Sequence, residues 1–214
     1  VNFFLAFMLV YASDWTNENN FGLLHLLNST TLLSIIIGVL LLDLVGAYLP
    51  HLVQHKVKLL WHIHIVHHTD QNVDTTTANR HHPFESIVRF IFTLTGIIIS
   101  GAPIGLVLMY QSLSVIFSQF NHANIQISDK VDKVLSYIIV SPNMHKVHHH
   151  FKLPYTDSNY GNIFSLWDRL FGTYMELNKN QIIYGVDTDL DEIQNSKFIS
   201  LIERPFKKWL DYFN

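Results

Sequence analysis

Cysteine is absent from the 214 residues of this chain. Its absence excludes disulfide bonds, thiolate metal sites and cysteine nucleophiles, so any metal ion must be bound through nitrogen or oxygen. Charged residues are scarce as well: they make up 14% of the chain, against roughly 25% in an average soluble protein. Since hydrophobic residues reach 49%, this scarcity predicts a membrane protein that carries a polar face.

A large excess of positive charge is also missing. The chain carries 14 basic and 17 acidic residues, a formal net charge of −3, and we expect no nucleic-acid partner. No repeat or linker divides the sequence, so we predict a single domain over residues 1–214, in which residues 178–214 form a polar, amphipathic C-terminal tail. The first segment, VNFFLAFMLVY, has neither an initial Met nor a basic residue. We interpret it as the cut end of a longer protein rather than as a signal peptide.

Long apolar runs predict helices that enter a membrane. Residues 1–12 are expected to form the tail of a first membrane helix. A second run begins at an N-cap, Asn28 or Ser29, and reaches Tyr48, which is about long enough to span roughly 30 Å of hydrocarbon. Asp43 lies inside this run. It is either a functional carboxylate or a helix-end residue bonded to a neighbouring helix, and we do not name it as a ligand.

A further apolar stretch, residues 87–120, is interrupted by Ser-Gly-Ala-Pro at residues 100–103. Its first arm of about 13 residues would be about 20 Å long, too short to cross the bilayer. We therefore predict a hairpin that dips into the membrane and returns to its starting side. Basic residues flank this hairpin, whereas residues 13–28 contain none. The positive-inside rule then places the flanking segments on the cytoplasmic face.

Beyond the hairpin, the sequence predicts shorter helices. Residues 129–140 are expected to form one, and Ser141-Pro142 reads as the N-cap and first residue of the next. Residues 154–161 are predicted to be a loop, and the aromatic-rich residues 163–175 are expected to pack against the site. The chain is predicted to end in an amphipathic stretch over residues 199–213.

Histidine is concentrated in one part of the chain: thirteen of the fourteen lie between residues 51 and 150. An i, i+4 pair and two His-x-x-His-His trios each place their rings on one helical face. As structural residues, three adjacent rings would need separate hydrogen-bond partners, whereas metal ligation satisfies all three at once. We therefore predict that the pair and both trios bind metal: His51, His55, His64, His67, His68, His145, His148 and His149.

Eight imidazoles exceed what one ion needs, because a structural zinc takes four ligands and a catalytic zinc three. Two ions with four or five ligands each fit better, and imidazole suits iron, zinc or copper. The segment HLVQH lacks the Glu of an HExxH zinc protease. Isolated histidines are more often structural, so His25, His62 and His150 are left out of the site.

Several segments share their order and spacing with one superfamily. HLVQH, LLWHIHIVHH, RHHPFE, NHANI, PNMHKVHHH and NYGNIFSLWDRLFGT resemble the sterol desaturase and fatty acid hydroxylase superfamily over about residues 40–175. The resemblance implies an integral membrane, non-haem di-iron oxygenase that uses O2 and electrons to hydroxylate or desaturate a lipid. The expected fold is all-α: a membrane helical bundle with a cytosolic helical cap that holds a histidine-rich dimetal site.

By motif position, the resemblance adds His122 to the predicted ligands. Some superfamily members carry another His four residues later, where this chain has Gln126. Gln126, and His82 of the RHHP motif in its place, are therefore candidate metal- or water-binding residues. Side chains that accept the second ring N–H commonly orient ligand histidines. The candidates for this role, each with a salt bridge or turn cap as its alternative, are Asp74, Glu85, Asn124, Asp157, Tyr160 and Asp168.

These features predict a lipid C–H oxidase with two iron ions (zinc in a purified sample) and O2 as co-substrate, and hydroxylation is favoured over desaturation. The alternatives are a dinuclear-zinc membrane hydrolase and a non-catalytic, metal-stabilised lipid-binding protein. The sequence has no cytochrome b5, GxGxxG or flavin signature, so electrons must come from a separate cytochrome b5-, ferredoxin- or reductase-type donor. Sterol, fatty acyl, alkylglycerol, sphingoid and carotenoid substrates all fit an apolar channel lined by the hairpin.

Overall fold

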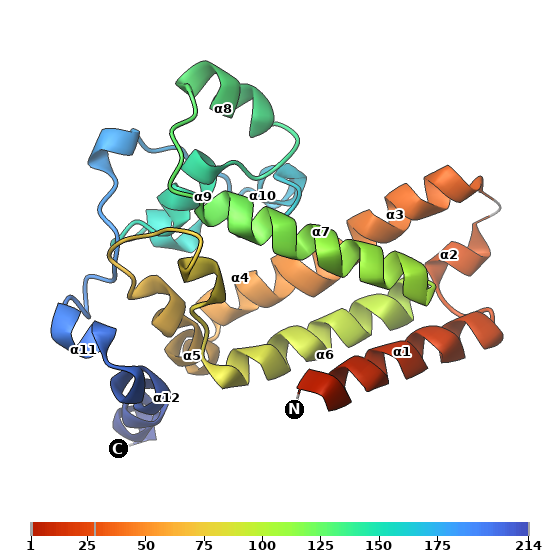
Figure 1. Ribbon diagram of the computed structural model, residues 1–214, viewed down its shortest axis with the longest axis horizontal. Coiled ribbons are helices and arrows are strands. Elements are labelled where there is room, and N and C mark those ends of the chain that lie inside the picture. The colour runs from red at the N-terminus through yellow and green to blue at the C-terminus, as the bar shows by residue number, and fades with distance from the viewer. Residues whose placement is uncertain (1, 28, 214) are drawn as a thin grey trace. The chain divides into compact units, whose positions relative to one another are not determined.

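The computed structural model describes residues 2–27 and 29–213, and these residues form an all-helical protein (Figure 1). Within this described part, extended pairing is limited to two isolated β-bridges. Three of the helices are long and apolar enough to cross a membrane. The predicted class, an all-α protein with membrane helices, is confirmed.

The chain divides into two compact units. The helix unit consists of Val1–Pro50 and Ile87–Ile116, and the histidine unit consists of His51–Ser86 and Phe117–Asn214. The helix unit contains α1 (Asn2–Glu18), α2 (Leu23–Leu26), α3 (Thr31–Asp43), η1 (Leu44–Tyr48) and most of α6 (Pro83–Ser100) and α7 (Ile104–His122).

A single long helix leads into the histidine unit. α3, the π-helical segment η1 and α4 (Leu49–Lys56) follow one another without a break, and together they form a 26-residue candidate membrane helix over Thr31–Lys56. The predicted apolar run ended at Tyr48, but the helix continues beyond it, and Leu49 has helical dihedrals of φ −63° and ψ −46°. Single π turns inside α-helices are frequent at functional sites, and this one lies just before the first His pair.

The start of this helix differs from the prediction. Thr30 is the N-cap, and its hydroxyl accepts a hydrogen bond from the N–H of Leu33 at 3.4 Å. Ser29, one of the two predicted caps, instead places its hydroxyl 2.7 Å from that of Ser34. The other, Asn28, lies outside the described residues.

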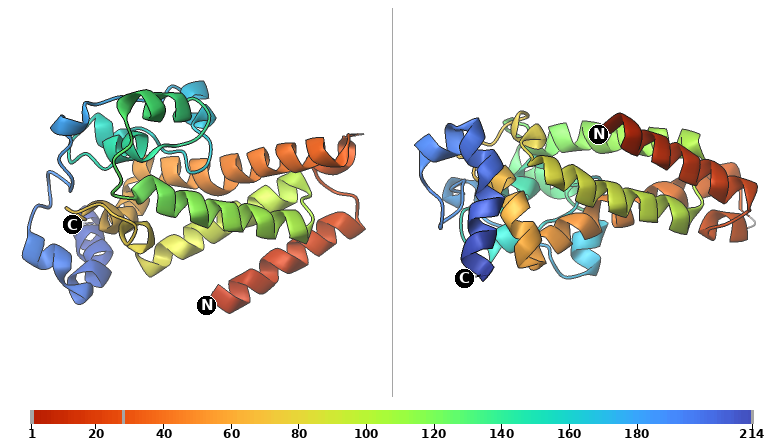
Figure 2. Two further views of the ribbon diagram at one scale, coloured as in Figure 1. Left: turned by 45° about the horizontal axis from the view of Figure 1, so that its top comes forward. Right: turned by 90° about the horizontal axis from the view of Figure 1, so that it is seen from below.

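The hairpin of α6 and α7 is longer than predicted, and both views of Figure 2 show the two helices joined at one end. α6 begins at Pro83 and has 18 residues, which is about 27 Å at 1.5 Å per residue. The expectation that this arm is too short to cross a membrane is therefore wrong. α7 has 19 residues, and both helices are long and apolar enough to span.

Two glycines bring the turns of the helix unit together. Gly22 has φ +108°, and a Cβ placed on it would lie 2.3 Å from the backbone nitrogen of Gly101. Ser13, in α1, adds a hydrogen bond from its hydroxyl to the carbonyl of Ala102 at 2.8 Å. Only glycine fits such an approach between two backbones without strain.

The histidine unit is built from short helices around the ends of longer ones. Ser141 caps α9 by accepting from the N–H of Met144 at 3.2 Å, and Pro142 follows at the first helical position, which confirms that prediction. The predicted amphipathic stretch forms a helix, α12, which packs against α5. The other elements are α5 (Lys58–His68), η2 (Thr77–Asn79), α8 (Asp129–Leu135), α9 (Pro142–His148), η3 (Tyr155–Asp157), α10 (Leu166–Leu170), η4 (Lys179–Gln181), α11 (Glu192–Ser196) and α12 (Phe198–Phe213).

α8 ends earlier than the predicted helix over residues 129–140. Ile139 pairs with Phe164 in a β-bridge, and the N–H of Val140 donates to the carbonyl of Ile163 at 3.0 Å. These backbone bonds compete with helix continuation, so the chain leaves the helix after Leu135. They also tie the segment before α9 to the segment before α10.

Candidate metal centre

Four helices deliver histidines to one place in the histidine unit. α4 carries His51 and His55 one turn apart, and α5 carries the first trio in its C-terminal half. His122 is the last residue of α7. α9 carries the first two members of the second trio, and His149 is its C-cap.

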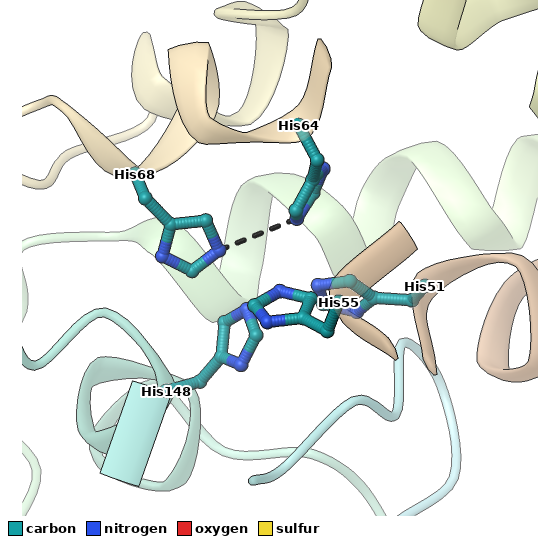
Figure 3. A group of neighbouring side chains, drawn as sticks. All are labelled: His51, His55, His64, His68 and His148. Atoms are coloured by element: carbon teal, nitrogen blue, oxygen red, sulfur yellow. Dashed lines mark hydrogen bonds between the residues drawn. The ribbon is translucent and has the colours of Figure 1, made fainter. Parts of the chain in front are cut away.

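The ring nitrogens of these histidines form two groups. The first cluster contains five residues and the second contains four, and within each cluster one ligand atom per residue lies within 4.8 Å of all the others. Figure 3 shows the rings of the first cluster turned toward a common centre. The first cluster is His51, His55, His64, His68 and His148, and the second is His67, His122, His145 and His149. These nine are the histidines that the sequence singled out.

Each trio is divided between the clusters. On α5, His64 and His68 belong to the first cluster, whereas His67 belongs to the second. On α9 the assignment is reversed, because His145 and His149 belong to the second cluster and His148 to the first. In both trios the i, i+4 pair stays together and the middle residue crosses over. The two trios therefore interlock, and neither serves one cluster alone.

The second cluster converges on His122. The Nε2 atom of this ring lies 3.1 Å from Nε2 of His67, 3.1 Å from Nε2 of His145 and 3.2 Å from Nε2 of His149. The Nδ1–H of His122 donates to the carbonyl of Ser118 at 2.8 Å, so in the neutral ring its Nε2 carries a lone pair. One lone pair cannot serve three hydrogen bonds at once. A cation shared by the four nitrogens would satisfy all of them.

In the first cluster, two rings are oriented by a hydrogen bond at the ring nitrogen that faces away from the cluster. The Nδ1–H of His51 donates to the carbonyl of Tyr160 at 2.8 Å, and that of His148 donates to the carbonyl of Ser158 at 2.7 Å. Both rings must then present an unprotonated Nε2 to the cluster. Among the described residues these two buried Nε2 atoms have no hydrogen-bond partner. The donor set therefore fits a second cation.

Burial keeps these rings neutral. It is the largest influence on His67, His68, His145, His148 and His149, and it lowers the pKa of each well below its ordinary value. Neighbouring imidazoles lower each pKa further, because a second positive ring nearby is unfavourable. Near neutral pH these five side chains thus present lone pairs, which is the form that binds metal.

Four of the six predicted orienting residues lie at the site, although Tyr160 acts through its backbone carbonyl and not through the predicted side chain. Glu85 is 1% exposed, and its Oε2 accepts from Nδ1 of His64 at 3.2 Å. Asp157 places Oδ1 3.4 Å from Nδ1 of His55, and its Oδ2 also forms a salt bridge with Nζ of Lys56 at 2.6 Å, which was the alternative predicted for it. Tyr160 contributes its carbonyl to His51.

Asp168 bonds the loop around Tyr160 rather than a ligand ring. Its carboxylate accepts from the backbone N–H groups of Tyr160 and Gly161 at 2.7 and 2.9 Å, and from the hydroxyl of Thr173 at 2.7 Å. Burial raises the pKa of Asp168 to about 6. This residue therefore fixes the loop whose carbonyl orients His51.

Asp74 and Asn124 lie elsewhere. Asp74 accepts from the N–H and hydroxyl of Thr76, both at 2.7 Å, and so serves as a turn cap. Asn124 is exposed. For Asp74 the structure thus shows the alternative role that was predicted beside ligand orientation, a turn cap.

The two further candidates for metal or water binding, His82 and Gln126, are not in the clusters. His82 Nε2–H donates to the carbonyl of Ile202 at 3.1 Å, and its Nδ1 accepts from the N–H of Phe84 at 3.2 Å. Both ring nitrogens are thus occupied at the start of α6. Gln126 is exposed. Neither is placed to bind the ions, because His82 has its bonds elsewhere and Gln126 faces solvent.

His81, which the sequence did not single out, lies against the site instead. Its Nδ1 is 3.0 Å from Oε1 of Glu85, and its ring stacks on that of His67 with centroids 4.6 Å apart and planes 20° apart. The i, i+4 spacing of His81 and Glu85 was a signal that could have found it. The backbone acceptors Ser118, Ser158 and Tyr160 left no such signal, because any residue supplies a carbonyl.

The comparisons with other proteins agree with this geometry. Residues 35–173 match the family described as Fatty acid hydroxylase. The ornithine lipid hydroxylase OlsE of Rhizobium tropici is 24% identical over 140 residues, which cover 65% of this chain and 41% of that protein. The alkylglycerol monooxygenase of Danio rerio is 32% identical over 146 residues, which cover 66% of this chain and 30% of that protein.

A further relative is the alkylglycerol monooxygenase of Caenorhabditis elegans, 29% identical over 146 residues that cover 66% of this chain and 27% of that protein. The chain therefore spans less than half the length of these curated relatives. No solved structure matches the chain.

Proposed function

This chain belongs to the fatty acid hydroxylase family, whose profile covers residues 35–173, and we propose that it is a membrane-bound, non-haem di-iron oxygenase that hydroxylates a lipid. The observation that carries the proposal is the meeting of nine imidazoles in two clusters of five and four. Each cluster has enough nitrogens for one ion. The proposed ligands are His51, His55, His64, His68 and His148 for one ion, and His67, His122, His145 and His149 for the other.

The chemistry of the substrate favours a redox metal. An alkyl C–H bond offers no group on which acid–base catalysis could act, so the oxidising power must come from the cofactor. Two bound iron ions would supply the chemistry that activates O2. The overall reaction inserts one oxygen atom into the C–H bond and reduces the other to water, with two electrons and two protons. Zinc would occupy the same imidazoles in a purified sample, because imidazole accepts both metals.

The protein's own part is to hold and aim the rings. Glu85, Asp157 and the carbonyl groups of Ser118, Ser158 and Tyr160 face the second nitrogens of the ligand rings. Such partners fix the tautomer and the direction of each ligand. Burial of the rings also keeps bulk water away from the ions.

The names of the relatives support a polar membrane lipid as the substrate. One relative is named for ornithine lipid and the others for alkylglycerol, and all are named as hydroxylases or monooxygenases. We therefore favour oxygen insertion over desaturation. The three apolar helices would hold the enzyme in the bilayer in which such lipids reside.

The electrons would come from a separate donor of the cytochrome b5, ferredoxin or reductase type. This follows from the absence of haem, flavin and dinucleotide signatures in the sequence. The positive-inside rule supports a cytoplasmic position for the histidine-rich face, where such donors would meet it.

The test compares the lipids of cells with and without the gene under 18O2. A lipid that gains one labelled oxygen only when the gene is present is the expected product. His148→Ala should abolish it, whereas His150→Asn should not, because His150 lies in neither cluster and Asn can still accept from the N–H of Ile183. Full activity of His148→Ala, or a product that forms without O2, would contradict the proposal, and the second result would point to a hydrolase.

A further inference from the structure

His81 is a half-buried histidine that touches both clusters without belonging to either. Its side chain is 19% exposed, and the residue lies two positions before Pro83, the first residue of α6. The Nε2–H donates to the carbonyl of Ala78 in η2 at 3.0 Å, which fixes the ring at one edge. Because the carbonyl and the Glu85 carboxylate both only accept, the ring that serves both contacts carries a hydrogen on each nitrogen and pairs with Glu85 as an imidazolium. The opposite edge and one face then point toward the site.

The edge contact reaches the first cluster through Glu85. This carboxylate divides its oxygens, with Oε2 on Nδ1 of His64 at 3.2 Å and Oε1 on Nδ1 of His81 at 3.0 Å. Glu85 is almost fully buried, so an oxygen that lost its partner would not be solvated. Such a carboxylate would turn or shift, and the His64 ring would lose its fixed direction.

The face contact reaches the second cluster directly. The His81 ring stacks on His67 at 4.6 Å. Nδ1 of His67 is buried without a hydrogen-bond partner among the described residues, whereas the Nδ1 of His122 in the same cluster is held by a carbonyl. On the side of the His67 ring away from its cluster, stacking on His81 is therefore a contact that limits rotation.

We propose that His81 is a positioning residue that holds one ligand of each ion, His64 through Glu85 and His67 through ring stacking. The inference rests on the proposed dimetal function and deepens it. The two contacts can be tested separately, because the edge and the face of one ring act on different clusters. Residues that orient metal ligands typically change metal affinity by about 10- to 100-fold when removed.

Two substitutions separate the contacts. His81→Phe keeps an aromatic ring against His67 but offers no nitrogen to Glu85. His81→Asn removes the ring but places an amide N–H close to the position of Nδ1, within reach of Glu85. The matched control is His82→Asn, the same change one residue later, where Asn can still accept from the N–H of Phe84.

The experiment uses the full-length protein in lipid nanodiscs, loaded with 57Fe. Metal content is measured after loading, the release of iron to a chelator is followed in time, and Mössbauer spectra report the two sites separately. We expect wild type and His82→Asn to hold two ions with the same spectrum. His81→Phe should release one ion about 10-fold faster or more and change one quadrupole doublet. His81→Asn should do the same to the other ion and the other doublet.

The outcomes distinguish the two proposals. If wild type binds no metal, the proposed function fails. If wild type holds two ions and both His81 variants keep its release rates and spectrum, only the role of His81 is overturned. That role is also overturned if both variants disturb the same doublet. Circular dichroism checks folding, and His81→Tyr replaces His81→Phe if that variant loses its helical signal.

Discussion

Five of the nine imidazoles in the two clusters have an oxygen facing the second ring nitrogen, and these partners are of two kinds. Backbone carbonyls hold His51, His122 and His148, whereas carboxylates face His55 and His64. Side-chain substitution cannot remove a carbonyl, but it can remove a carboxylate. The two acidic residues are therefore where ligand orientation can be tested by mutation.

Glu85→Gln should weaken metal binding more than Asp157→Asn. A Gln amide has one oxygen and one NH2 group, so either His64 or His81 would face a donor in place of an acceptor. We expect a loss of about 10- to 100-fold in metal affinity for Glu85→Gln, measured by chelator competition. Asp157 has a side chain that is 30% exposed, so water can replace its contact and the loss should be smaller. Equal affinity of Glu85→Gln and wild type would contradict this role for the carboxylate.

At the scale of elements, the loop between η3 and α10 depends on a single residue, Asp168. The loop between η3 and α10 supplies two carbonyls to the first cluster, from Ser158 and Tyr160. Asp168 holds this loop through three hydrogen bonds. The direction of the His51 ring thus depends on a residue that does not touch it.

Asp168→Asn should destabilise the protein and loosen the first cluster. The amide NH2 group cannot accept from a backbone N–H, so at least one buried donor near Tyr160 would lose its partner, at a cost of roughly 1–3 kcal/mol. Thermal unfolding followed by tryptophan fluorescence measures the effect, with metal content as the second readout. The control is Asp187→Asn, because Asp187 is exposed. An unfolding midpoint of Asp168→Asn equal to that of the control would show that the three bonds do not hold the loop.

In the helix unit, Gly22→Ala should destabilise the protein, whereas Gly105→Ala should not. A Cβ on Gly22 would lie 2.3 Å from the nitrogen of Gly101 at a φ of +108°, whereas a Cβ on Gly105 would meet nothing within 4 Å. We expect Gly22→Ala to destabilise by roughly 2–4 kcal/mol. Gly105→Ala should be neutral or stabilising by up to about 1 kcal/mol. Unfolding midpoints of both variants in nanodiscs test this, and a tolerated Gly22→Ala would refute the close approach of the two turns.

At the scale of the whole molecule, the ions are expected to stabilise one unit and not the other. All nine proposed ligands belong to the histidine unit. Without ions, their buried nitrogens would face one another unsatisfied. Each ion at about 100 times its Kd would add about 2.7 kcal/mol of stability.

Removing the metal with a chelator should therefore raise hydrogen exchange in α5 and α9 while leaving α3 unchanged. Exchange of backbone amides, measured by mass spectrometry on peptides from both units, gives the comparison within one sample. Restoring iron should restore protection. Uniform exchange with and without metal would mean that the clusters do not need the ions for their structure.

The sequence by itself determined the helical class, the apolar spans and eight of the nine histidines that meet, whereas His122 was added by the resemblance to the superfamily. These features depend on local periodicity and composition: an i, i+4 or i, i+3 spacing fixes which rings share a helical face, whatever the helix packs against. Capping chemistry is equally local, which is why Ser141-Pro142 predicted the start of α9 correctly. The length of α6 was missed because the polar residues before Ile87 join the helix at Pro83.

Only the tertiary structure decided how the rings are shared. Spacing on α5 and α9 could not show that each trio divides between two clusters, because that depends on how α4, α5, α7 and α9 meet. Spacing also could not show which of two neighbouring histidines contacts the site. His81 does and His82 does not, because the backbone dihedrals direct their side chains differently. The carbonyls of Ser118, Ser158 and Tyr160 were invisible for the same reason: every residue has one, and only packing aims it.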